Sequence, residues 1–127
     1  MACLLLVDDH AAPRQALALL LARDPGLSGL EIAEAGSLAE ARRCLIAAPP
    51  DLAVVDLGLP DGGGAALLAE LRSAHPGCAL LALAADQAET DRVHAATGVA
   101  VLCKTEPLAA VLGGIRGLAG GDRLPVP

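Results

Sequence analysis

Four charged side chains directly follow apolar stretches of the sequence, and their types suit the binding of a divalent cation and a phosphoryl group. Asp8 and Asp9 follow the first apolar stretch, Asp56 the third and Lys104 the last. Carboxylates that lie close together repel unless a cation joins them, and an open site with few oxygen ligands suits Mg²⁺. Beside Mg²⁺ and a lysine, a carboxylate can accept a phosphoryl group, because both cations neutralise charge on the transferred group. Asp56, the central acid, is the predicted acceptor.

Five apolar stretches predict the strands that must bring these side chains together. Short apolar stretches that end at Asp, Gly or Pro are typical of strands buried on both faces. The second stretch also contains Glu31 and Glu34, and charges within a strand indicate the edge of a sheet. The predicted strands are Ala2–Val7, Leu30–Ala35, Leu52–Val55, Cys78–Leu83 and Val99–Cys103.

Apolar residues at helical spacing predict a helix after most of these strands. Ser37 and Glu40 have the spacing of a capping box, which satisfies free amide groups at a helix start. The segment Gln87–Ala96 has few apolar anchors, so we expect a weakly held helix there. The other apolar faces are Leu17, Leu20 and Leu21, then Leu38, Ala41 and Leu45, then Leu67, Leu68 and Leu71, and finally Leu108, Val111, Leu112, Ile115 and Leu118.

The alternation of strands and helices predicts a single α/β domain, an open parallel sheet with helices on both faces. Five such units are the number found in the flavodoxin-like fold, with strand order 2-1-3-4-5. Ligands of that fold bind outside the carboxyl ends of strands one and three. Because those ends carry Asp8, Asp9 and Asp56, we expect the three acids to converge.

The composition excludes several classes of function for this domain. The chain has 127 residues, 54% of them hydrophobic and none aromatic, and a net charge of -6. An acidic surface argues against direct contact with nucleic acid, so any DNA contact would come from another domain. The first apolar stretch ends at Val7 and is too short for a signal peptide, and no later stretch approaches membrane-spanning length. We therefore expect a cytoplasmic protein without membrane contact.

The four cysteines are predicted to be reduced, small core residues. None of them lies at the short spacing that zinc and redox sites need. Most fall in or beside apolar stretches, where a free thiol behaves as a small hydrophobic group. They are Cys3, Cys44, Cys78 and Cys103.

Three motifs together resemble the receiver domain of two-component response regulators. They are Leu6-Val-Asp8-Asp9-His10, Val55-Asp56-Leu-Gly-Leu-Pro60-Asp61-Gly62 and Val101-Leu-Cys-Lys104. The resemblance covers essentially the whole chain, in order and with the right spacing. The end of the sequence is similar to the subfamily with a LuxR-type helix-turn-helix output domain. We expect residues 1–119 to form the receiver domain and 120–127 a linker or tail, with the output domain absent.

The resemblance implies a role for each residue of the predicted site. Asp56 would receive a phosphoryl group from a histidine kinase, and Lys104 would pair with the phosphoryl oxygens. Mg²⁺ would be bound directly by Asp9 and Asp56, mainly through water by Asp8, and by the backbone carbonyl of Gly58. In this family the domain catalyses its own phosphorylation and dephosphorylation, yet it acts as a switch rather than a turnover enzyme.

Two positions depart from the family pattern. Receivers usually have Thr or Ser at the end of strand four and Tyr or Phe within strand five, whereas this chain has Ala84 and Val101. A hydrogen bond to a charged group contributes about 1.5–3 kcal/mol, whereas moving a switch from 1:99 to 99:1 takes about 5.5 kcal/mol. Losing the hydroxyl would remove a large share of the drive. We therefore expect phosphorylation to be coupled weakly, or by another route, to the output.

Other interpretations stand beside these. The chain could be a pseudo-receiver, a protein interaction module that acts independently of phosphorylation. Asp8 and Asp9 could merely cap the first helix. His10 is predicted to be a solvated loop histidine rather than a ligand, and Asp61 a turn residue. Small residues on the last helix suggest a homodimer formed through that helix.

Overall fold

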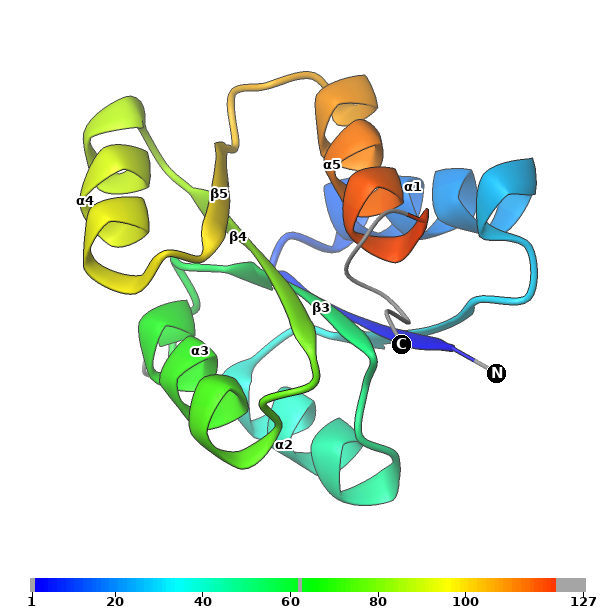
Figure 1. Cartoon of the computed structure of the whole chain (residues 1–127), viewed down its shortest axis with the longest axis horizontal. Coiled ribbons are helices and arrows are strands. Elements are labelled where there is room, and N and C mark those ends of the chain that lie inside the picture. Colours follow the sequence, from blue (N-terminus) through cyan, green and yellow to red (C-terminus); the bar gives the residue numbers. More distant parts are fainter. Residues whose placement is uncertain (1, 62, 121–127) are drawn as a thin grey trace.

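The computed structural model describes residues 2–61 and 63–120 and shows a parallel sheet between two layers of helices (Figure 1). The strands lie in the order β2-β1-β3-β4-β5, all parallel to their neighbours. The predicted flavodoxin-like fold and strand order are therefore confirmed, and the acidic second strand lies at an edge. The strands are β1 (Cys3–Val7), β2 (Glu31–Ala35), β3 (Leu52–Asp56), β4 (Ala79–Ala84) and β5 (Ala100–Cys103).

The helices divide between the two faces of the sheet. In Figure 1, α1 and α5 lie together on one face, α2 and α3 lie on the other, and α4 lies beside β5. Alternating residues of each strand point to opposite faces, so each strand contributes to two cores. The helices are α1 (Ala11–Arg23), α2 (Leu38–Ala47), α3 (Gly63–Ala74), α4 (Gln87–Thr97) and α5 (Leu108–Gly120), with a short 3-10 helix, η1, at Pro25–Leu27.

Aliphatic side chains fill both cores, as the absence of aromatic residues requires, and Cys44 and Cys78 pack against one of them. Beneath α2 and α3, Val7 and Val55 are completely buried. In the core between the sheet and the pair α1 and α5, Leu4, Leu52 and Ile115 of α5 are equally inaccessible. Because the central strands β1 and β3 are buried on both faces, their carboxyl ends are held firmly at one edge of the sheet.

Two members of the predicted apolar helix faces lie outside the core, since Leu20 is 41% and Leu108 is 38% exposed. The buried residues of α1 are Leu17 and Leu21. The predicted cap is present, because the Ser37 hydroxyl accepts from the Glu40 N–H and the Glu40 carboxylate accepts from the N–H of Gly36. The prediction for α4 holds, since that helix buries none of its residues.

The remaining expectations concern the cysteines, the tail and the membrane. The four cysteines are free thiols, of which Cys103 is buried and the other three are partly buried. Burial raises the pKa of the Cys78 thiol to about 12, which keeps it protonated and unreactive. The predicted tail, 120–127, lies outside the described residues except for Gly120, which is the last residue of α5. Among the described residues, no helix is long and apolar enough to cross a membrane.

Candidate functional site

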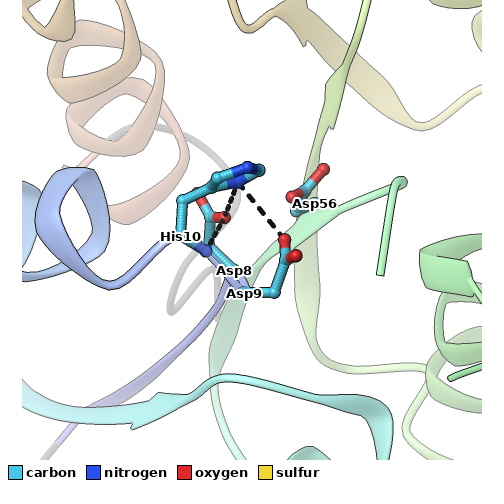
Figure 2. Close-up of side chains that lie close together, drawn as sticks. All are labelled: Asp8, Asp9, His10 and Asp56. Atoms are coloured by element: carbon cyan, nitrogen blue, oxygen red, sulfur yellow. Dashed lines mark hydrogen bonds and ion pairs between the residues drawn. The ribbon is translucent and has the colours of Figure 1, made fainter. Parts of the chain in front are cut away.

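The aspartates at the carboxyl ends of β1 and β3 converge with the neighbouring His10 (Figure 2). The last paired residues of β1 and β3 are Val7 and Val55. The next residues, Asp8 and Asp56, therefore lie side by side where the two strands end. One ligand atom from each of Asp8, Asp9, His10 and Asp56 lies within 4.8 Å of all the others. Asp8 and Asp56 are buried, with 5% and 2% of their surfaces exposed, whereas Asp9 and His10 are exposed.

Lys104 provides the positive charge that this group of acids needs. Its Nζ donates a hydrogen bond to Asp56 Oδ2 at 2.9 Å and lies 3.6 Å from Asp8 Oδ1. The Lys104 backbone N–H donates to the Ala84 carbonyl at 2.7 Å, which extends the β4–β5 ladder by one bond. Since β4 separates β5 from β3, the lysine side chain must pass over the end of β4 to reach Asp56.

Opposing effects act on the charge of Asp56. Burial alone would raise the pKa of its carboxyl, but the Gly58 N–H and the Lys104 ammonium hold that pKa below its usual range. For Lys104, burial disfavours the charged form, yet the hydrogen bond to Asp56 raises the pKa of the ammonium. Asp56 is therefore a carboxylate and Lys104 a cation at neutral pH, as a phosphoryl acceptor and its counter-charge require.

Two glycines hold the backbone around Asp56. The N–H of Gly58 donates to Asp56 Oδ1 at 2.9 Å, which fixes the carboxylate from the loop that follows it. Gly64, in the first turn of α3, packs so closely that a Cβ there would lie 2.2 Å from the Asp56 carbonyl oxygen. No side chain larger than hydrogen fits at residue 64 without moving Asp56.

His10 is a solvated loop residue, as predicted, but its ring also contacts the site. Its side chain is 62% exposed, yet Nδ1 lies 3.2 Å from Asp8 Oδ1, 3.3 Å from Asp9 Oδ1 and 3.2 Å from Lys104 Nζ. The prediction of a solvated loop residue was therefore incomplete. The available signal was its position directly after Asp9, in the loop at the strand end.

Two further residues, Arg14 and Asp61, hold the segments around the site through hydrogen bonds to the backbone. Arg14 Nη1 donates to the Asp8 carbonyl at 2.7 Å, and its Nε donates to Glu34 on β2 at 2.9 Å. Asp61 accepts from the N–H groups of Leu38 and Ala39, at 2.8 and 3.2 Å, and so caps α2 from another loop. These N–H bonds, that of Leu38 first, lower the pKa of Asp61. Asp61 is more than the turn residue that was predicted.

The two positions that depart from the family pattern have apolar surroundings. Ala84 is completely buried at the end of β4, and Val101 is half-buried against the core beneath α2 and α3. Beside them, Cys103 Sγ lies 3.7 Å from the Ala85 carbonyl and 3.0 Å from Thr105 Oγ1. The Cys103 thiol thus connects the loop after β4 with Thr105 in the loop after β5. This thiol and hydroxyl stand at positions different from those of the Thr or Ser and the aromatic residue of the family pattern.

The donor set at this edge of the sheet suits Mg²⁺. It contains three carboxylates, two of them buried, and buried carboxylates require positive charge. Mg²⁺ prefers oxygen ligands and keeps several waters, and the exposed side of Asp9 leaves the site open to solvent. The residues present therefore fit this ion.

Comparison with known proteins agrees with this geometry. Residues 4–107 match the response regulator receiver domain family. Over 93 residues the chain is 44% identical to the DNA-binding transcriptional activator DevR/DosR of Mycobacterium tuberculosis, covering 71% of this chain and 42% of that protein. Over 88 residues it is 40% identical to the transcriptional regulatory protein DpiA of Escherichia coli, covering 68% of this chain and 38% of the relative. The chain thus spans less than half the length of these relatives.

Solved structures show the same fold. A two-component response regulator of the LuxR family from Aurantimonas has a TM-score of 0.78 at 27% identity, with 99% of this chain and 92% of that chain covered. A CheY-like receiver domain protein from Methanospirillum hungatei has a TM-score of 0.76 at 23% identity, with 91% of each chain covered. On the strength of the family match over most of its length, the chain belongs to the response regulator receiver domain family.

Proposed function

We propose that this domain is a phosphorylation-controlled switch in which Asp56 receives a phosphoryl group from a histidine kinase. The observation that supports this most is the buried Asp56 carboxylate, paired with Lys104 at 2.9 Å and adjoining two further aspartates. Receiver domains of transcriptional response regulators interact with histidine kinases, and they bind Mg²⁺ at an acidic pocket. The family is a signalling domain rather than a conventional enzyme.

The chemical step uses the free electron pair of the Asp56 carboxylate. One carboxylate oxygen attacks phosphorus, an acyl phosphate O–P bond forms, and the P–N bond to the kinase imidazole breaks with its electron pair left on nitrogen. The Gly58 N–H, which bonds Asp56 Oδ1, keeps the carboxylate oriented. Lys104 Nζ, already 2.9 Å from Oδ2, moves its hydrogen bond to a phosphoryl oxygen. Attack by water on the acyl phosphate later restores Asp56 and releases phosphate.

The metal ion would be held by three carboxylate side chains and one backbone carbonyl of the site. Asp9 and Asp56 would bind Mg²⁺ directly, Asp8 mainly through water, and Gly58 through its carbonyl oxygen. Bound there, the ion supplies positive charge to the phosphoryl oxygens. The buried Asp8 is held in position by Arg14, which bonds its carbonyl, and by the His10 N–H, which bonds its carboxylate at 2.9 Å.

The output is proposed to be transcriptional, since one relative is named a DNA-binding transcriptional activator. DNA contact would be made by an output domain outside residues 1–119, in keeping with the acidic composition of this chain. We place the protein in the cytoplasm. A homodimer through α5 is also proposed, because Gly113 and Gly117 are exposed there and leave open space for a close helix.

Incubation with phosphoramidate and Mg²⁺ tests the proposed acceptor. Intact-mass spectrometry should show one added phosphoryl group on the wild type and none on Asp56→Asn, whose amide is not a competent acceptor. The matched control is Asp91→Asn, which removes an exposed carboxylate from α4 and should be modified like the wild type. Failure to modify the wild type, under conditions that modify an ordinary receiver, would favour the pseudo-receiver alternative.

That alternative has specific support in Ala84 and Val101, which lack the hydroxyl and the aromatic ring of the usual relay. Because Asp56 and Lys104 are both in place, we propose instead that phosphorylation still occurs. Its coupling to the face formed by α4 and β5 is weak. ¹H–¹⁵N NMR of phosphorylated protein should show shifts in the loops after β1, β3 and β5, with little change along α4. Large shifts throughout α4 and β5 would contradict weak coupling, and the Cys103–Thr105 contact would then be the first route to examine.

A further inference from the structure

His10 brings a nitrogen ligand into a group of oxygen ligands. Its Nδ1 lies 3.2 Å from Asp8 Oδ1 and 3.3 Å from Asp9 Oδ1 (Figure 2). Ligand atoms at neighbouring corners of an octahedron, each about 2.1 Å from the metal, are about 3.0 Å apart. The imidazole nitrogen and the carboxylate of Asp9, which is proposed above as a direct ligand, thus have nearly the spacing of ligands that share one ion.

The contact with Lys104 shows which side of the imidazole faces the pocket. Lys104 Nζ lies 3.2 Å from His10 Nδ1, and an ammonium group can only donate hydrogen bonds. Asp8 Oδ1 and Asp9 Oδ1, which only accept hydrogen bonds, lie at the same nitrogen, so these contacts do not fix the tautomer of His10. They do show that Nδ1 is the ring atom that faces the pocket, where its electron pair would bind a metal ion in place of these contacts.

We propose that the acidic pocket binds first-row transition-metal ions through His10 Nδ1 as well as through its aspartates. Imidazole favours ions such as Co²⁺, Ni²⁺ and Zn²⁺, whereas Mg²⁺ prefers oxygen ligands. His10 is therefore a selectivity residue that raises the affinity for these ions and leaves that for Mg²⁺ nearly unchanged. This inference rests on the proposed metal site of the receiver, and it assigns His10 a role beyond that of a solvated loop residue.

Calorimetric titration with Co²⁺ and with Mg²⁺ at pH 7.5 tests the proposal on the wild type, His10→Ala and His94→Ala. His10→Ala keeps the backbone N–H that bonds Asp8. Because the His10 side chain is exposed, we expect this variant to fold like the wild type. Far-UV circular dichroism checks the fold of each protein. His94→Ala is the matched control, because His94 lies on α4 and bonds the Val99 carbonyl instead.

His10→Ala should weaken Co²⁺ binding at least about tenfold, which is about 1.4 kcal/mol, and change Mg²⁺ binding less than about twofold. The visible bands of bound Co²⁺ should also shift as nitrogen ligation is lost, while His94→Ala should leave affinity and spectrum unchanged. Equal loss of affinity for both ions, or no loss for Co²⁺, would overturn the proposal. Neither titration depends on phosphoryl transfer, so loss of phosphorylation at Asp56 with an intact His10 effect would refute only the switch.

Discussion

Gly64→Ala is expected to lower the free energy of unfolding by about 3 kcal/mol, near the upper end of overpacking costs. A Cβ at residue 64 would lie 2.2 Å from the Asp56 carbonyl oxygen, 2.8 Å from the Asp56 carbonyl carbon and 2.8 Å from Leu57 Cα. All three are backbone atoms of the strand end, so no side-chain rotation relieves the overlap. Either α3 or the acceptor backbone must shift, and the change should therefore also slow phosphorylation of Asp56.

The sign of this effect distinguishes it from helix propensity. Within a helix, Gly→Ala normally stabilises by about 1 kcal/mol, as we expect for Gly113→Ala in monomeric protein, where a Cβ on α5 meets nothing within 4 Å. Urea unfolding followed by far-UV circular dichroism measures both variants, since the chain has no Trp or Tyr for fluorescence. A Gly64→Ala protein as stable as the wild type would contradict the close contact.

The strands and their order were predictable because each depends on a local pattern. An apolar stretch ended by acids or glycines predicts a buried parallel strand wherever it stands, and the strand order followed from five alternating units. The convergence of Asp8, Asp9 and Asp56 then required no further information. Lys104 was also found from its place at a strand end, although its contact with Asp56 depends on reaching over β4.

Other parts of the site depend on distances between segments that no local pattern records. Asp61 caps α2 across a sequence separation of 23 residues, and Gly64 is confined by the backbone of Asp56. Arg14 reaches the Asp8 carbonyl from α1, while an arginine on a helix surface is ordinarily a solvated charge. His10 was judged by residue type alone, and its contacts come from the loop conformation.

The Lys104→Met variant should accept a phosphoryl group from phosphoramidate about 100-fold more slowly, the lower end of the cost of removing one preorganised donor. Its Nζ donates to Asp56 Oδ2 at 2.9 Å and would follow the charge onto the phosphoryl oxygens. Lys104 is the only lysine of the chain, so ¹⁵N-lysine NMR can report directly on its ammonium in the wild type. An unchanged rate would show that the lysine does not act on the transferred group.

The same variant should lose about 2 kcal/mol of stability at pH 7, because a buried carboxylate loses its charged hydrogen-bond partner. The pKa of Asp56 is held low in the folded protein, so its pairing stabilises above the unfolded value of about 3.9 and is lost as pH falls through the lower folded value. The raised pKa of Lys104 extends the stabilisation up to about pH 10, near the unfolded lysine value of about 10.4.

Urea unfolding of wild type and Lys104→Met between pH 3 and pH 7, both without divalent ions, measures this dependence. The difference in unfolding free energy should be smallest at the acid end, grow as Asp56 ionises and level off near neutrality. The control is Arg92→Met, which removes a surface cation that is 66% exposed and 3.7 Å from Glu89, and should cost less than about 0.5 kcal/mol at any of these pH values. If the Lys104→Met difference stays constant across the range, packing of the lysine stem, rather than its charge, stabilises this edge of the sheet.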